Sequence, residues 1–195
     1  MCFCIGGTLF MQGCVTQLPS VPEEGSLPSN VAVGRVVVVL TGARSRIYEP
    51  AVKSFEVENR QTKQRFNVQI ESDNESFILP LAPGDYELTR VQINEGPFLS
   101  MAQLASTFSI GQDHVTYLGT WRFGVDSPKY GRMVSVSMVS DEEDRVEALQ
   151  TLGQEQQVEM RDIATALPDP PELQTRLYEV MPYPRVPRYF RRHWW

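Results

Sequence analysis

The stretch at residues 77–88, Phe-Ile-Leu-Pro-Leu-Ala-Pro-Gly-Asp-Tyr-Glu-Leu, constrains the fold more than any other part of the chain. Phe77, Leu79 and Leu81 fall on one side of an extended backbone, because successive side chains of a strand point to opposite faces. The next four residues, Ala-Pro-Gly-Asp, place proline and glycine where a type II turn needs them. The alternation then resumes at Tyr86. The stretch predicts two core strands that meet at a rigid corner.

Other strands are indicated by the same kind of pattern. Residues 34–41 are apolar on both faces and rich in valine, which is typical of a strand covered on both sides. Residues 54–60 and 65–71 alternate apolar and polar side chains, and the polar residues 61–64 separate them. These two stretches are predicted to form a hairpin with one face in water.

The strand that follows the corner changes phase. Tyr86 and Leu88 share one parity, whereas Val91 and Ile93 have the other. A β-bulge near residues 89–90 would return all four side chains to the core.

Two more regions complete the expected sandwich. Residues 98–106 are interpreted as a connection with room for a helical turn, and residues 134–139 as the last strand. Between them a long strand contains Gly119, which favours a bend or a close approach of the backbone. The residues that share one parity along this strand are Val115, Tyr117, Trp121 and Phe123.

A helical segment is predicted over residues 140–167. Ser140 and Glu143 have the spacing of a capping box, and Val146, Leu149 and Leu152 form one apolar stripe behind it. A second helical stretch is expected to pass through Met160, Ile163, Ala164 and Leu167 before the prolines that follow residue 167 end it.

The order of these elements predicts a mainly β fold. Strands followed by a terminal helix favour an antiparallel β-sandwich of about seven strands over residues 33–139, with a helical appendage and an extended tail. Residues 77–88 are similar to the core motif of prealbumin-like, or carboxypeptidase regulatory-like, sandwiches. Tyr117-Leu118-Gly119 also resembles uncharacterised bacterial lipoproteins with this domain. The resemblance implies an immunoglobulin-like sandwich with an accessory, adhesive or ligand-binding role, and it supplies no catalytic residue.

The N-terminus has the character of a lipoprotein signal peptide. Residues 1–13 carry no charge and are too short to span a bilayer, but they suit the apolar part of a signal peptide. Residues 9–14 resemble the bacterial lipoprotein cleavage motif, which implies that Cys14 is lipidated. The valine after Cys14 implies sorting to the outer membrane. The alternative is a buried N-terminal strand or helix.

Residues 14–32 contain Pro19, Pro22 and Pro28 among serine, glycine and glutamate, and this composition is typical of a solvated tether. In polyproline geometry such a tether would hold a domain about 50 Å from a membrane.

Residues 168–195 are expected to be a tail rich in proline, arginine and aromatic residues on an otherwise acidic chain. The tail could dock on a partner protein, on anionic headgroups or on the acidic helix of its own chain. The alternative is a solvated tail that docks on nothing. The proposed contact residues are Arg185, Arg188, Tyr189, Phe190, Arg191, Arg192, Trp194 and Trp195.

Composition and motifs exclude several classes of function. The net charge of −6 argues against nucleic-acid binding. The sequence has no Gly-rich phosphate loop, nucleophile elbow or helical His-Glu-x-x-His pair, so we predict no enzyme, no catalytic residue, no cofactor and no metal site. Asp113 and His114 are interpreted as an exposed turn rather than a catalytic pair, and the acidic residues 141–144 as a helix start rather than a calcium site.

The function expected from the sequence is a non-enzymatic interaction or structural module. It would be anchored to the outer membrane through Cys14, facing the periplasm or the cell surface, as an accessory subunit of an envelope assembly with a protein partner. The alternative is a carbohydrate or small-ligand binding domain, in which Tyr117 and Trp121 would stack on a sugar if they faced solvent. Core packing is the preferred interpretation of these two residues, because they share the parity of Val115.

Overall fold

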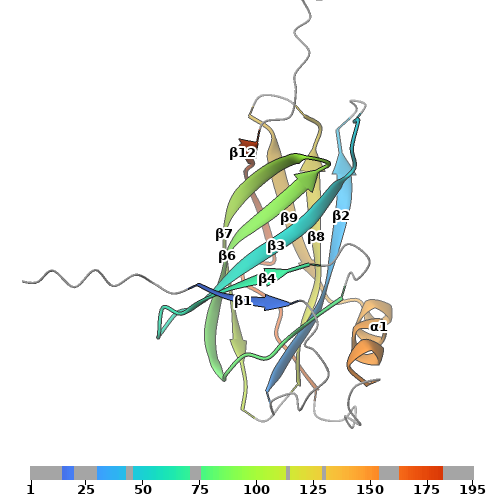
Figure 1. Cartoon of the computed structure of the whole chain (residues 1–195). Helices are drawn as coiled ribbons and strands as arrows, with labels where there is room; N and C mark the ends of the chain where they lie inside the picture. Colours follow the sequence, from blue (N-terminus) through green and yellow to red (C-terminus); the bar gives the residue numbers. More distant parts are fainter. Residues whose placement is uncertain are drawn as a thin grey trace, which may run out of the picture.

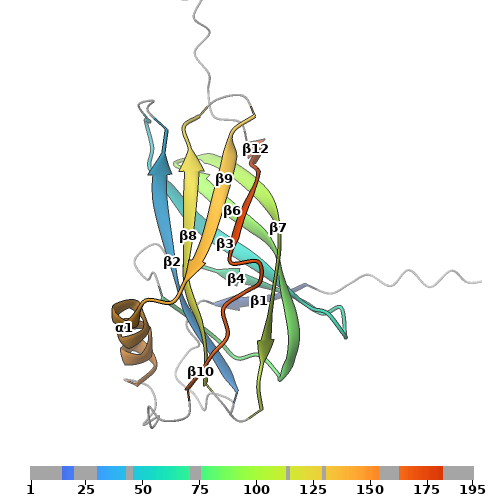
Figure 2. The ribbon, with the colours of Figure 1, turned by 180° about the vertical axis from the view of Figure 1, so that it is seen from behind.

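The computed structural model describes residues 15–19, 30–42, 46–70, 76–112, 115–128, 131–153 and 163–181. In this part of the chain two sheets face each other as a sandwich, and one short helix lies beside them (Figures 1 and 2). Sheet A contains, in spatial order, β1 (Val15–Pro19), β4 (Arg65–Gln69), β3 (Pro50–Asn59), β6 (Gly84–Glu95), β7 (Phe98–Ile110) and β12 (Tyr178–Met181). Sheet B contains β11 (Glu172–Arg176), β9 (Met133–Val139), β8 (Val115–Asp126), β2 (Val31–Thr41) and β5 (Ser76–Leu79), and β10 (Ile163–Thr165) also pairs with β8. The helix is α1 (Glu142–Gly153).

The mainly β sandwich is confirmed, but both sheets are mixed rather than antiparallel. β2 runs parallel to β8, β1 runs parallel to β4, and β10 runs parallel to β8. Twelve strands occur within the described residues, more than the seven expected. Alternation along a strand reports which face is buried and not the direction of the neighbouring strand, so the sequence pattern could not reveal the parallel pairs.

The corner at the end of β5 carries the chain from one sheet to the other. Phe77, Leu79 and Leu81 are buried in the main core, as expected, and β6 then begins in sheet A. The hydroxyl of Tyr86 donates a hydrogen bond to the carbonyl oxygen of Ala82 at 2.8 Å. This geometry is that of a tyrosine corner, in which a tyrosine at a strand start bonds back to the preceding turn.

The predicted bulge in β6 is confirmed. The register of β6 against β3 shifts where Arg90 pairs with Glu56 and Leu88 pairs with the next residue, Val57, so Thr89 is the additional residue. Tyr86, Leu88, Val91 and Ile93 are all buried in the main core as a result. The predicted hairpin of β3 and β4 is also confirmed, with antiparallel pairing from Ser54 opposite Gln69 onward.

Trp121 occupies the centre of the main core. Its ring centroid lies 5.0 Å from that of Phe55 and 4.9 Å from that of Phe77, and the indole nitrogen donates to the carbonyl oxygen of Leu118 at 3.0 Å. The aromatic cluster therefore joins strands of both sheets.

The shared parity expected along β8 is wrong, because the strand changes phase at Gly119. Gly119 has a φ of +82°, which favours glycine, and a Cβ there would lie 2.4 Å from Leu167 Cδ2. Before the glycine, Tyr117 points toward the helix side of sheet B, whereas Trp121 after it points into the sandwich.

The connection predicted over residues 98–106 is wrong, because these residues belong to β7. Its inward positions in this stretch include Ser100, Ala102, Leu104 and Ser106, all buried. Small and hydroxyl side chains give a weak strand pattern by themselves, and the pairing of β7 with β6 supplies the missing stabilisation.

The helix differs from its prediction at both its cap and its buried side. Asp141 caps it, since its Oδ1 accepts a hydrogen bond from the Glu143 amide at 2.9 Å, and Ser140 does not. Ala148 and Leu149 are buried, whereas Val146 is exposed.

The helix and tail predicted for the C-terminal part are wrong over residues 163–181. Residues 163–165 form β10, β11 extends sheet B beside β9, and β12 extends sheet A beside β7. Leu177, between β11 and β12, is buried in the main core. Each strand is short and mostly exposed, so no alternation in the sequence marks it. The sandwich thus extends beyond residue 139.

The tether predicted over residues 14–32 is wrong at both of its ends. Val15–Pro19 forms β1 at the edge of sheet A, and Val31 and Ala32 begin β2. β1 is exposed and short, and its pairing with β4 places it in the sheet.

Candidate functional site

The outer face of sheet B is covered by α1 over only part of its length. Ala148 and Leu149 pack there against a second apolar cluster on β2, β5 and β8. This cluster contains Val31, Val33, Ile78, Val115 and Tyr117, with Ile163 of β10 packed against it. The helix therefore closes one half of the face, beside the starts of β2 and β8 (Figure 2).

Ion pairs fasten the helix to the sheet. Arg35 Nη1 lies 2.7 Å from Asp144 Oδ1 and 2.7 Å from Glu147 Oε2. Thr120 Oγ1 donates to the other oxygen of Asp144 at 2.8 Å. Asp144, in the first turn of the helix, thus has structural partners, and no three metal-binding side chains come together within the described ranges.

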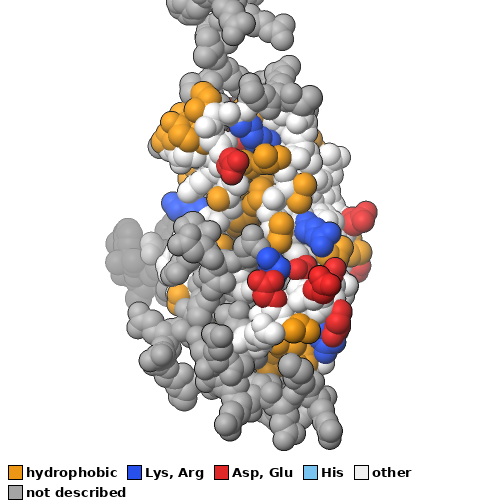
Figure 3. Space-filling model, turned by 90° about the vertical axis from the view of Figure 1, so that its right-hand side faces the viewer, with side chains coloured by type: hydrophobic (Ala, Val, Ile, Leu, Met, Phe, Trp, Pro, Cys, Tyr) orange, Lys and Arg blue, Asp and Glu red, His pale blue; other side chains and the backbone are white. Residues whose placement is uncertain are grey.

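Beyond the helix the same face contains an open groove of about 630 Å³. Its residues come from four neighbouring strands. Figure 3 shows the molecule from the side of α1 and β2, with hydrophobic side chains gathered in the upper part of this view and acidic ones in its lower part. The groove is lined by Val39, Thr41, Arg122, Gly124, Ser135, Val136, Ser137, Glu172, Leu173 and Gln174.

Small side chains form the floor of the groove. A Cβ on Gly124 would lie 2.3 Å from Ser135 Oγ and 3.2 Å from Thr41 Cγ2, so this position has no room for a larger residue. Hydroxyl groups, an amide, a guanidinium and a carboxylate line the groove beside the half-exposed side chain of Val39. Such a surface can offer donors, acceptors and apolar contact to an extended ligand.

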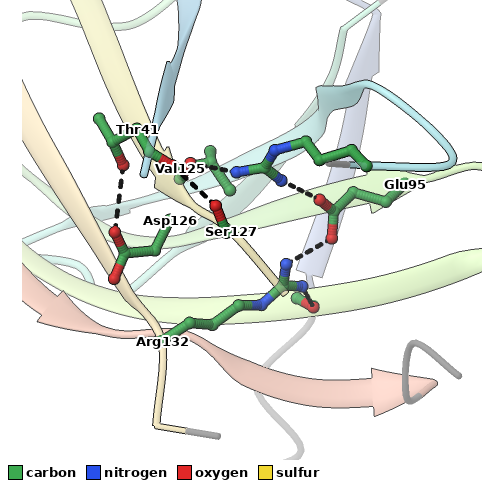
Figure 4. A network of polar contacts seen from close by, with 8 residues as sticks. Thr41, Glu95, Val125, Asp126, Ser127 and Arg132 are labelled. Carbon is green, nitrogen blue, oxygen red and sulfur yellow. Dashed lines mark hydrogen bonds and ion pairs between the residues drawn. The ribbon is translucent and has the colours of Figure 1, made fainter. Parts of the chain in front are cut away.

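A buried ion network lies near the groove, because it includes the carbonyl group of Val125, which follows the groove residue Gly124 in β8 (Figure 4). Glu95 accepts hydrogen bonds from Arg46 on one oxygen and from Arg132 on the other. Arg132 also donates to Ser100 Oγ, and Arg46 donates to the carbonyl oxygen of Val125. The side chains of Glu95 and Arg132 are each only 1% exposed. Because its members come from both sheets and from the β2–β3 connection, the network links the sheets there.

The network also anchors an apolar edge. Ile47, beside Arg46, is 69% exposed, and the Tyr48 ring packs 6.0 Å from the ring of Phe98. Ile47 and Tyr48, together with Val39 and Leu40 before the β2–β3 connection, expose apolar surface on both sides of that connection. Exposed apolar surface next to a groove is typical of an interaction site.

The structure buries both rings that the sequence offered for sugar stacking. Tyr117 and Trp121 are fully buried, and burial raises the pKa of the Tyr117 hydroxyl. The alternative required exposed rings, so it is wrong at these residues. Asp113 and His114 lie outside the described residues, as do Cys14 and the tail residues from Arg185 to Trp195.

Sequence patterns did not indicate the groove or the ion network. Half of the groove residues are serine, threonine, glutamine or glycine, and the ten residues lie on four different strands, so they carry no motif. Arg46, Glu95 and Arg132 lie far apart in the sequence, so only the fold brings them together.

No helix among the described residues is long and apolar enough to cross a bilayer. No protein-family model, curated protein or solved structure matches this chain.

Proposed function

We propose that this chain is a membrane-anchored, non-enzymatic binding module of the bacterial cell envelope. Its anchor is lipid on Cys14, and its sandwich serves as an accessory subunit that binds a partner protein on the periplasmic or outer side of the outer membrane. The cleavage motif at residues 9–14 supports the anchor. The open groove on sheet B supports the binding role, and it is the observation on which this proposal depends.

The chemistry of the groove favours a polypeptide segment as the ligand. Small floor residues allow a backbone to approach, while hydroxyl and amide groups can pair with peptide groups and Val39 offers apolar contact. No aromatic ring lines the groove, whereas sugar sites generally gain affinity from aromatic stacking. The apolar side chains of Ile47 and Tyr48 extend the contact beyond the groove.

Site-specific photo-crosslinking in cells tests the binding role. A crosslinker at Val39 or Gln174, in the groove, should give one discrete protein adduct, and the same crosslinker at the exposed Gln103 on sheet A should not. Val39→Asp should abolish the adduct formed from Gln174 without lowering the thermal midpoint. Equal adducts from the groove and from Gln103 would count against a binding groove.

Intact mass and membrane fractionation test the anchor. The wild-type protein should gain the mass of lipid at Cys14 and sediment with membranes, and Cys14→Ser should do neither. A soluble wild-type protein that retains residues 1–13 would refute the anchor.

The tail is proposed as a second contact with the partner, through its arginine and aromatic residues. Deletion of residues 185–195 should weaken the groove adduct. An unchanged adduct yield and unchanged membrane association would remove the tail from the proposal.

A further inference from the structure

β1 places the start of the domain at the edge of sheet A. Val15 pairs with Arg65 and Pro19 with Gln69, and the side-chain oxygen of Gln17 accepts from Asn67 Nδ2 at 3.0 Å. Cys14 is bonded to Val15, and consecutive Cα atoms lie about 3.8 Å apart. A lipid on Cys14 would therefore attach next to the β3–β4 turn rather than at the far end of a long tether.

The β3–β4 turn presents cations at this point. Residues 59–65, Asn-Arg-Gln-Thr-Lys-Gln-Arg, contain three basic residues and no acidic one. The side chains of Lys63 and Arg65 are 68% and 47% exposed. The acidic partner, Glu58, lies behind them on β3 and is only 12% exposed. Its pKa is lowered mainly by the hydrogen bond from Lys63 and also by Arg65, although its partial burial opposes this shift.

Lys63 occupies an unfavourable backbone conformation. Its φ is +61°, in the left-handed region that glycine or asparagine adopts more readily than lysine. The Lys63 amide donates to the Asn59 carbonyl at 2.9 Å, and the Asn59 side-chain oxygen accepts from the Gln61 and Thr62 amides, so the turn itself enforces this conformation. Asparagine would suit the backbone of this position better, but it would remove the cation from the turn.

From this juxtaposition we infer that the β3–β4 turn rests on the anionic surface of the membrane that holds Cys14. The inference depends on the proposed lipidation of Cys14. The acyl chains hold β1 at the bilayer, and Arg60, Lys63 and Arg65 lie against anionic headgroups, where each cation adds about fivefold to affinity. In Figure 1 the turn and the start of β1 lie on the left, whereas α1 and β2 lie on the right. This orientation leaves the sheet B groove away from the membrane and open to a partner.

Fluorescence quenching in vesicles tests the orientation. Full-length protein, matured and lipidated in a bacterial host, is labelled at Gln61→Cys in the turn or at Gln150→Cys on α1, both exposed positions. It is reconstituted in phosphatidylethanolamine–phosphatidylglycerol vesicles that carry a headgroup-level quencher. We expect strong quenching at position 61 and little at position 150. Equal quenching at the two positions, or none at position 61, would overturn the inference.

Charge removal tests the electrostatic part. Arg60→Gln with Lys63→Asn should reduce the quenching at position 61 severalfold in the anionic vesicles and should leave the thermal midpoint unchanged or higher. Lys53→Asn is the control. Lys53 lies on β3 beside Ile70, the residue after β4, so this variant removes the same kind of charge away from the turn and should leave the quenching unchanged. In the labelled protein without these charge substitutions, the quenching at position 61 should decline with added salt and in phosphatidylcholine vesicles, because screening and neutral headgroups weaken the attraction. If the quenching changed neither with salt nor in phosphatidylcholine vesicles, the electrostatic contact would be refuted.

The mass of the purified protein separates the two possible failures. If Cys14 carries no lipid, the anchor of the proposed function fails and this inference fails with it. If Cys14 is lipidated and the label at position 61 is not quenched, the anchor stands and only the orientation is refuted.

Discussion

The hydroxyl of Tyr86 ties the corner between the two sheets to the start of β6. Tyr86→Phe removes this hydrogen bond and keeps the ring, so we expect the free energy of unfolding to fall by about 1–2 kcal/mol, measured by urea denaturation. Tyr48→Phe, at the exposed end of the sandwich, should change it by less than about 0.5 kcal/mol. A comparable loss in both variants would contradict a specific role for the corner.

Buried tyrosines should make the protein sensitive to alkali. Burial raises the pKa of both Tyr86 and Tyr117 above the ordinary value of 10.0. The folded state then holds these protons after the unfolded state has lost them, so their stabilisation is complete below pH 10 and declines as the pH rises further. We expect the free energy of unfolding to fall above pH 10, and less steeply when both residues are phenylalanine. Equal slopes in the two proteins would contradict this origin.

The Glu95 carboxylate neutralises part of the positive charge of Arg46 and Arg132. Glu95→Gln would leave Arg46 and Arg132 without their carboxylate, and we expect a loss of about 3–5 kcal/mol of unfolding free energy by chemical denaturation. Glu142→Gln, which breaks an exposed pair with Arg145, should cost less than about 1 kcal/mol. The network is structural if the two costs differ in this way, and a small cost for Glu95→Gln would refute that role.

At the scale of elements, the bend in β8 depends on Gly119. Gly119→Ala adds a methyl group 2.4 Å from Leu167 Cδ2 and 2.7 Å from the Val139 carbonyl oxygen, at a φ of +82°. We expect a loss of about 3 kcal/mol from backbone strain and overpacking together, measured by thermal or urea unfolding. Gly131→Ala also has a positive φ but has open space around it, so it should cost only about 1 kcal/mol. Similar losses would show that crowding is not what requires glycine in β8.

The elements that could be predicted from sequence are those whose signal is local. The β3–β4 hairpin, the corner before β6 and the bulge at Thr89 each follow from alternation within a short stretch. β7 could not be predicted because small residues such as Ala102 fill its inward positions. β10, β11 and β12 could not be predicted because they form by pairing with neighbouring strands and have no clear alternation of their own. The groove could not be predicted for the same reason, since no single strand carries its chemistry.

At the scale of the whole molecule, β11 and β12 close one side of the sandwich. Leu177 is buried where the chain passes from sheet B to sheet A. Deletion of residues 172–195 should therefore lower the midpoint of unfolding far more than deletion of residues 182–195, by calorimetry. Equal effects of the two deletions would show that the edge strands contribute little to stability.

The parallel pair of β2 and β8 has a further consequence, for the order in which the protein folds. The strands β3, β4, β6 and β7 lie in the chain between these two partners, and they pair largely with their sequence neighbours in sheet A. Loops that enclose many residues close slowly, so sheet A should assemble before β8 reaches β2. During that interval Phe55, Leu88 and Val91 would lack the cover of sheet B and could associate with other chains. The rate at which β2 and β8 meet therefore sets how long a refolding chain is prone to aggregate.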